Sequence, residues 1–143
     1  YYPKDKDHLQ YIDELQSFNF DVISAINMNE MKVELDRLIN SNQYEYIFLD
    51  GFLLYEDELL YRRLDRKYFL YLTKEECLRR RMSRSYNSID TPNYFEKCVW
   101  IEFLNYKQKC EKTYTDIVFI DGTRPINDIF EFVNNDIKQI EIN

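Results

Sequence analysis

The stretch KYFLYLTKEECLRRRM, residues 67–82, joins a run of apolar side chains to the start of a charged segment. Its first part, KYFLYLT (67–73), has the length and the aromatic residues typical of a buried β-strand. Thr73 and Glu76 then match the T-x-x-E capping box, in which side chains accept the first backbone N–H groups of a helix. We therefore predict a strand that leads directly into an N-capped helix.

Two more segments have strand character, YEYIFLD (44–50) and DIVFID (116–121). The spacing of apolar residues and the N-terminal signals predict helices over residues 22–40, 56–64, 92–110 and about 125–140. Asn27 and Glu30 form a possible capping pair within the first of these segments. The chain therefore alternates between predicted strands and predicted helices.

Almost unbroken apolar strands separated by helices indicate an α/β fold with a parallel sheet that is covered by helices. We find no repeats or linkers, so we predict a single domain over residues 1–143. In such sheets, ligands bind beyond the carboxyl ends of the strands. Two strands end in an acid and a glycine, at Asp50-Gly51 and Asp121-Gly122, although ordinary turn chemistry explains these dipeptides equally well.

Composition excludes several classes of protein. The chain is 45% hydrophobic and has only two glycines, which argues for a packed globular domain. Its net charge of −7 argues against a partner held by summed positive charge, such as nucleic acid or a membrane surface. No apolar run approaches the roughly 20 residues that span a bilayer. The three cysteines form no CxxC pair and His8 is the only histidine, so we expect reduced, mostly buried thiols in a cytoplasmic protein and no zinc site.

The segment LRRRMSR (78–84) concentrates four arginines in this acidic chain. On a helix, Arg80 and Arg84 share one face, and Arg81 is rotated by about 100° from Arg80. One guanidinium group can bind two phosphate oxygens at once, so the arginines at one helix end can hold an anion. The alternative is a solvated basic face that pairs with neighbouring acids such as Glu76. The position directly after a strand favours the anion-binding interpretation.

Other side chains are candidates for a nucleotide or nucleoside site. Asp50 follows a predicted buried strand, where a carboxylate commonly binds Mg²⁺ directly or through water. Asp21 could cap the 22–40 helix or accept hydrogen bonds from the hydroxyls of a sugar. Phe20 and Tyr86 could enclose a flat base, although core packing is the default role for an aromatic residue in this chain.

The chain contains no phosphate-binding loop of the form G-x-x-x-x-G-K-[ST]. Its only glycines, Gly51 and Gly122, do not fit that pattern.

Four segments together resemble the nicotinamide riboside kinases, which belong to the uridine kinase-like P-loop kinases. They are FNFDVISAINMNEM (18–31), YIFLDGFLLY (46–55), YFLYLTKEECLRRRMSRSYNSIDTPNYFEKCVW (68–100) and VFIDGT (118–123). The match covers nearly the whole chain in order, and its most specific part runs from Glu75 to Trp100. Members of this family transfer the γ-phosphate of ATP to the ribose 5′-hydroxyl with Mg²⁺.

The resemblance implies roles for residues on the nucleoside side of the site. Asp21 would bind ribose hydroxyls, and Phe20 with Tyr86 would flank the nicotinamide ring. Asn87 would lie near the substrate. Arg81 would face the acceptor nucleoside.

The resemblance also implies the contacts with ATP and metal. Arg80 and Arg84 would be lid arginines that contact the phosphates, and the loop that starts at Arg124 would lie against the adenine. Asp50 would correspond to an acid of the family that helps to position Mg²⁺.

The chain departs from the family at its beginning, because Tyr1-Tyr2-Pro3 resembles the residues just after the segment that supplies the catalytic base. We therefore expect residues 1–143 to be an incomplete kinase domain with the nucleoside-binding, lid and C-terminal portions. The first two strands, the P-loop and the base Asp would lie upstream, so no catalytic residue is expected in this chain. We expect such a polypeptide to have negligible kinase activity. The alternatives are a uridine or cytidine kinase and a non-catalytic interaction module.

Overall fold

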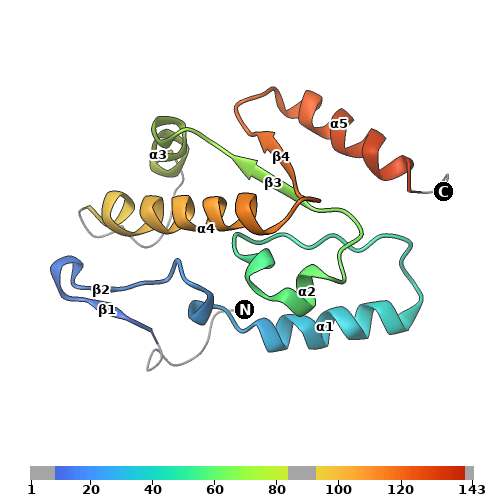
Figure 1. Ribbon diagram of the computed structural model, residues 1–143, viewed down its shortest axis with the longest axis horizontal. Helices are drawn as coiled ribbons and strands as arrows, with labels where there is room; N and C mark the ends of the chain where they lie inside the picture. The colour runs from blue at the N-terminus through green and yellow to red at the C-terminus, as the bar shows by residue number, and fades with distance from the viewer. Residues whose placement is uncertain (1–8, 84–92, 141–143) are drawn as a thin grey trace. The chain divides into compact units, whose positions relative to one another are not determined.

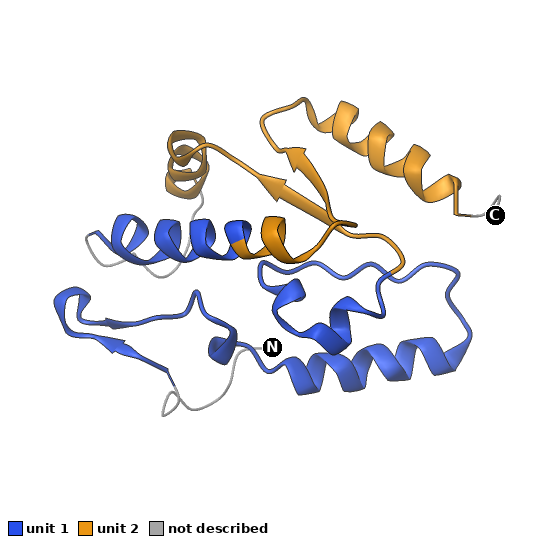
Figure 2. Ribbon diagram, viewed as in Figure 1, with its two compact units in different colours: residues 1–64, 90–108 blue, residues 65–89, 109–143 orange. Residues whose placement is uncertain are grey.

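The structure is a computed structural model that describes residues 9–83 and 93–140. The chain divides into two compact units, which Figure 2 distinguishes by colour. Unit 1 contains residues 1–64 and 90–108, and unit 2 contains residues 65–89 and 109–143. The single domain expected over residues 1–143 stays a prediction.

A two-stranded parallel sheet lies in unit 2 (Figure 1). Strand β3 (Tyr68–Tyr71) pairs with strand β4 (Val118–Asp121), and Tyr68 lies opposite Val118. Ahead of the two strands, the buried Lys67 ammonium lies 2.8 Å from the Asp116 carboxylate. The sequence prediction is confirmed for these two strands and for an α/β fold with a small parallel sheet.

Two helices of unit 2 begin where local signals predicted. Helix α3 (Lys74–Met82) follows β3, and the Thr73 hydroxyl accepts a hydrogen bond from the Glu76 backbone N–H at 3.3 Å. Helix α5 (Ile126–Lys138) begins directly after Pro125. The Tyr68 hydroxyl donates to the Asp136 carboxylate at 2.6 Å, which ties α5 to β3.

In unit 1, helix α1 (Met28–Ser41) begins later than the predicted start at Val22. The Asn27 side chain accepts the Glu30 backbone N–H at 3.1 Å, so the predicted capping pair is confirmed. The preceding residues form a short 3₁₀ turn, η2 (Ile23–Ala25). The Asn27 cap therefore sets the start of α1, and the apolar residues before Asn27 are not part of this helix.

The remaining elements of unit 1 are short or lie in the long helical segment. A small antiparallel hairpin, which the sequence did not predict, pairs β1 (Tyr11–Ile12) with β2 (Ser17–Phe18) around a 3₁₀ turn, η1 (Asp13–Leu15). Further along are η3 (Leu54–Glu56), α2 (Glu58–Tyr61), the π-helical stretch η4 (Phe95–Val99) and α4 (Trp100–Thr113), whose residues from 109 onward belong to unit 2. The long helix predicted over 92–110 thus exists, with a π-helical first turn.

The predicted strand over residues 44–50 is wrong, because the structure forms no strand there. Its aromatic side chains are exposed, Tyr44 at 57% and Phe48 at 75%. A strand needs a neighbour for its backbone N–H and C=O groups, and among the described residues none pairs with this segment. Apolar composition alone therefore did not produce a strand.

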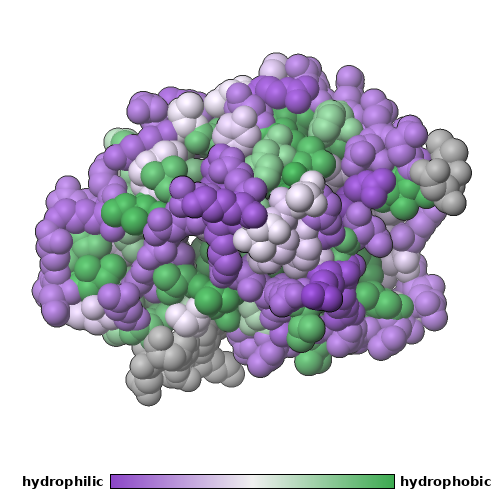
Figure 3. Space-filling model, in the orientation of Figure 1, coloured by the Kyte–Doolittle hydropathy of each residue, from purple (hydrophilic) through white to green (hydrophobic). Residues whose placement is uncertain are grey.

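Each unit buries its own set of apolar side chains. The buried residues of unit 1 include Leu15, Ala25, Met28, Leu35, Leu53, Leu60, Tyr94, Cys98 and Tyr106. Those of unit 2 include Phe69, Cys110, Ile117 and Ile120. On the face shown in Figure 3, other apolar residues lie in separate patches among polar ones. All three cysteines are free, and Cys98 and Cys110 are buried, as predicted.

The helices in the described part of the chain are all too short or too polar to cross a membrane.

Candidate functional site

Residues 19–21 form a strap after β2 that places Phe20 and Asp21, the two predicted nucleoside contacts of unit 1. The Asp21 backbone N–H donates to the Asn19 side-chain oxygen at 2.9 Å. The Phe20 backbone N–H donates to the Tyr94 hydroxyl at 3.0 Å. Both side chains are only partly buried. One hydrogen bond within the strap and one to Tyr94 outside it therefore fix its backbone conformation.

The Asp21 carboxylate lies against Tyr94. The Tyr94 hydroxyl donates to Asp21 Oδ2 at 3.0 Å, and the carbonyl oxygen of Phe18 lies 3.3 Å from the same hydroxyl. Burial raises the pKa of Tyr94 well above its usual range, so the phenol keeps its proton. Asp21 does not cap α1, because Asn27 does. Of the two roles that the sequence left open for Asp21, the N-cap is wrong.

A buried polar cluster supports the strap and was not predicted. Asn19 is only 4% exposed, and its side-chain amide donates to Glu102 Oε1 at 2.9 Å. The Cys98 thiol donates to the Asn19 side-chain oxygen at 3.1 Å. Burial raises the pKa of Cys98, so the thiol remains a donor. The signal in the sequence was the spacing of Tyr94, Cys98 and Glu102, which lie four residues apart on one helix face.

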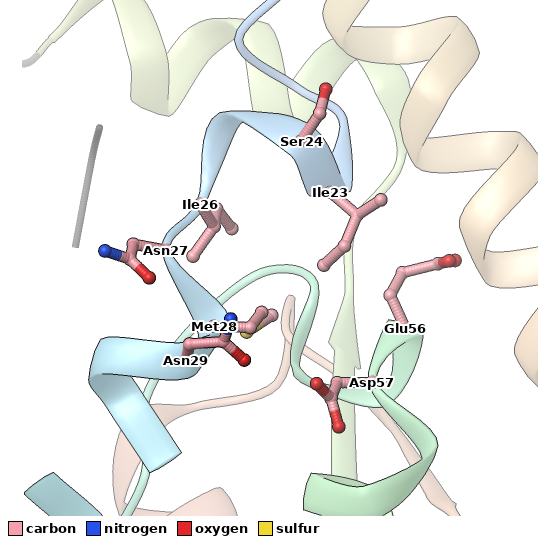
Figure 4. Close-up of a pocket in the computed structure, with 8 residues that line it drawn as sticks. All are labelled: Ile23, Ser24, Ile26, Asn27, Met28, Asn29, Glu56 and Asp57. Carbon is pink, nitrogen blue, oxygen red and sulfur yellow. The ribbon is translucent and has the colours of Figure 1, made fainter. Parts of the chain in front are cut away.

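A pocket of about 290 Å³ lies in unit 1 beside the residues that follow Asp21. Figure 4 shows Ile23, Met28 and Asp57 among the side chains that line it. The Asp57 carboxylate caps α2 and lies 2.6 Å from the Lys32 ammonium. Burial by itself raises the pKa of Asp57. Hydrogen bonds from Lys32 and the Leu60 backbone contribute to a larger opposite effect, so the pKa lies below its usual value. Asp57 thus has a structural role at this pocket.

The arginine-bearing helix α3 of unit 2 contains internal ion pairs. Arg79 Nε and Nη2 both donate to the Glu76 carboxylate at 2.7 Å, and Arg80 Nε donates to it at 2.6 Å. The acid-paired basic face that the sequence left as an alternative is therefore present for these two arginines. Arg81 lies in the last turn of α3 and is partly buried.

Arg80 also contacts the loop after β4, because its Nη2 donates to the Gly122 carbonyl at 2.9 Å. A side chain at Gly122 would meet the Tyr71 carbonyl and Leu72 at 3.1 Å, so this position requires a close backbone approach. The structure thus brings together two predicted ATP-side regions, the arginine helix and the loop after β4.

The loop after β4 is ordered by its own acid. Asp121 Oδ1 accepts the Thr123 backbone N–H at 2.8 Å and the Thr123 hydroxyl at 2.7 Å. These hydrogen bonds lower the pKa of Asp121 below its usual value. The Arg124 guanidinium lies 5.9 Å from the centre of the Phe132 ring in α5. Arg124, predicted near adenine, therefore sits beside an aromatic side chain.

Asp50 is exposed in the irregular segment 44–50, so the strand on which its metal role was based is absent. In the described ranges, no group of three or more His, Cys, Asp or Glu residues is placed to hold a metal ion. The predicted role of Asp50 in binding Mg²⁺ stays a prediction. Arg84, Tyr86 and Asn87 lie outside the described residues, and their predicted roles also stay predictions.

The Glu76 cluster predicts a pH dependence of stability. Hydrogen bonds from Arg79 and Arg80 lower the pKa of Glu76 from 4.5 to about 2. A folded-state pKa below the unfolded value means that ionised Glu76 stabilises the fold above about pH 4.5, and this contribution is lost as the pH falls toward 2. We expect Glu76→Gln to lower the melting temperature at pH 7 and to have a smaller effect at pH 3.

Thermal unfolding at both pH values, followed by circular dichroism, measures this difference. Glu75→Gln is the matched control, because Glu75 is an exposed acid in the same helical turn. The melting temperature of Glu75→Gln should depend on pH as that of the wild type does. An equal loss for Glu76→Gln at pH 7 and pH 3 would contradict the assignment.

The described geometry defines an α/β protein in which a parallel strand leads into an N-capped, arginine-bearing helix. Nicotinamide riboside kinase 1 of Rattus norvegicus is 34% identical over 141 residues, which cover 90% of this chain and 72% of the rat protein. The Homo sapiens protein of the same name is 32% identical over 133 residues, covering 84% and 67% of the two chains. The chain belongs to the nicotinamide riboside kinase family.

A more distant relative is nicotinamide riboside kinase of Saccharomyces cerevisiae, which is 27% identical over 116 residues and is covered over 47% of its length. No protein-family model matches the chain.

Proposed function

We propose that the chain forms the nucleoside-binding and lid portion of an enzyme that phosphorylates nicotinamide riboside at its ribose 5′-hydroxyl. The donor is ATP, and the product is nicotinamide mononucleotide, an intermediate of NAD biosynthesis. The observation that carries this proposal is the 34% identity with nicotinamide riboside kinase 1 across 90% of the chain. A cytoplasmic location is part of the same proposal.

On the nucleoside side, Asp21 accepts hydrogen bonds from ribose hydroxyls, and Phe20 contacts the base together with Tyr86. Asn87 and Arg81 complete the contacts with the acceptor. The ordered strap around Asp21 supports this assignment, because a carboxylate held by Tyr94 is prepared to receive hydroxyl groups in one orientation.

On the phosphate side, Arg80 and Arg84 bind ATP, and the loop at Arg124 contacts its adenine. Arg80 already donates to Glu76 and Gly122, but a guanidinium has five N–H donors and can bind a phosphate oxygen as well. Asp50 fits Mg²⁺ chemically, because this ion takes one or two carboxylates together with substrate phosphates. Mg²⁺ would neutralise charge on the phosphates.

A substrate panel tests this function on the protein as its gene encodes it. Nicotinamide riboside, uridine and cytidine are each supplied with ATP and Mg²⁺, and the phosphorylated product is identified by mass spectrometry. We expect the highest kcat/KM for nicotinamide riboside. A higher value for uridine or cytidine would overturn the acceptor, and no turnover with any of them would favour a non-catalytic module.

A polypeptide of residues 1–143 should show negligible turnover in the same assay, because it contains no G-x-x-x-x-G-K-[ST] loop. Positioning and electrostatic stabilisation of the phosphates supply most of the catalysis in phosphoryl transfer. Robust turnover by this polypeptide would show that the phosphates are held by other means.

A further inference from the structure

We propose that Tyr94 is a positioning residue, whose hydroxyl orients the Asp21 carboxylate toward the ribose hydroxyls of the nucleoside. This inference rests on the proposed function, in which Asp21 is the ribose contact. Tyr94 is 6% exposed and lies at the start of the helical segment that continues into α4. It acts through Asp21 and need not touch the substrate.

The hydrogen-bond inventory of the phenol determines its orientation. The Tyr94 hydroxyl has one proton, and it already accepts the Phe20 backbone N–H at 3.0 Å. Its proton can go to Asp21 Oδ2 at 3.0 Å or to the Phe18 carbonyl at 3.3 Å, and the Cys98 thiol is a further hydrogen-bond neighbour. The shorter contact goes to a carboxylate, and a bond to an ionised acceptor is the stronger kind. The proton therefore lies toward Asp21.

A second set of hydrogen bonds holds the backbone of Asp21. Asn19 holds the Asp21 backbone, and its own side chain is fixed by Cys98 and Glu102 from the same helix. Tyr94 directly precedes the π-helical stretch Phe95–Val99, and Cys98 lies within it. Such stretches frequently occur at functional sites. The helix thus holds both the backbone and the carboxylate of Asp21.

A fixed carboxylate binds more tightly, because less conformational freedom is lost when the ligand arrives. Removing the Tyr94 hydroxyl leaves the aspartate in place but removes one hydrogen bond that orients its carboxylate. The loss of affinity should therefore appear only with ligands whose hydroxyl groups donate hydrogen bonds to Asp21.

The test is Tyr94→Phe, measured by calorimetric titration of nicotinamide riboside and of its analogue without the 2′- and 3′-hydroxyls. We expect roughly tenfold weaker binding of the riboside, the scale of one hydrogen bond to a charged group. Binding of the analogue should be unchanged. A merely structural role would weaken both ligands together and would leave their ratio as in the wild type.

Tyr106→Phe is the matched control. Tyr106 is 7% exposed and lies in the same helical segment of unit 1, and its hydroxyl accepts the Tyr55 backbone N–H at 2.9 Å. This variant also loses a buried phenol contact, so it measures the general cost to the fold. It should leave the ratio of riboside to analogue binding as in the wild type.

A double-mutant cycle with Asp21→Asn separates this inference from the proposed function. If Tyr94→Phe adds nothing to Asp21→Asn, the two residues act together and the inference holds. If Asp21→Asn weakens riboside binding but Tyr94→Phe behaves as Tyr106→Phe, the inference is wrong and the proposed function stands. If Asp21→Asn has no effect, or the wild type binds no riboside, the proposed site is wrong and the inference with it.

Discussion

Asp21→Ala is expected to weaken the binding of nicotinamide riboside by roughly 100-fold, because two hydroxyl contacts to one carboxylate would be lost. The turnover of bound substrate should change less, since Asp21 is proposed to contact the sugar and not the transferred phosphate. Calorimetric titration gives the dissociation constant, and steady-state kinetics of the gene-encoded protein give kcat and KM separately.

Asp13→Ala is the control for this change. Asp13 is an exposed acid of the same unit, in the turn between β1 and β2. The Asp13→Ala substitution removes the same charge but leaves residues 19–21 unchanged, so riboside affinity should stay at the wild-type value. Equal affinities of wild type and Asp21→Ala would remove Asp21 from the site.

Arg81→Ala is expected to lower kcat/KM by roughly 100-fold or more, the effect of losing one preorganised donor to charge that develops in the transition state. The reason is that Arg81 is proposed to face the acceptor, where the phosphate is transferred. The ion pairs with Glu76 are made by Arg79 and Arg80, so this variant keeps them. Steady-state kinetics and thermal unfolding together distinguish a catalytic loss from a structural one.

Arg79→Ala provides the comparison within the same helix. Its side chain is 68% exposed and paired with Glu76, so it should affect stability at neutral pH more than kcat/KM. If Arg79→Ala and Arg81→Ala lower kcat/KM equally, the effect comes from the summed charge of α3, and the specific role of Arg81 is wrong.

The same kind of sequence signal gave different results at different strands. The apolar runs 67–73 and 116–121 became β3 and β4, while the equally apolar run 44–50 remained irregular and exposed. The physical difference is pairing, because β3 and β4 satisfy each other's backbone groups and residues 44–50 have no such neighbour in the described chain. Strand propensity is a property of the segment, but a strand is a property of a pair.

The candidate site divides in a similar way. Residue type and resemblance selected Asp21 and Phe20 as candidate nucleoside contacts, which stay predictions. They did not reveal Asn19, Cys98 or Glu102, because a buried amide, a thiol and a glutamate carry no catalytic signature. Residue type also left two roles open for Asp21, and the structure excluded the helix cap because Asn27 occupies that position.

The helix starts at Thr73 and Pro125 were readable from the chain itself, because such signals act within three or four residues. For α1 the capping pair at Asn27 was recognised, but the start was predicted at Val22. The Tyr94–Asp21 contact joins residues 73 positions apart, and the pair Tyr68 and Val118 is also far apart in the sequence. No local preference encodes such contacts, since they form only when packing brings distant segments together. The capping residues were thus readable from the sequence, whereas the contact between the Tyr94 phenol and Asp21 became visible only once the chain was folded.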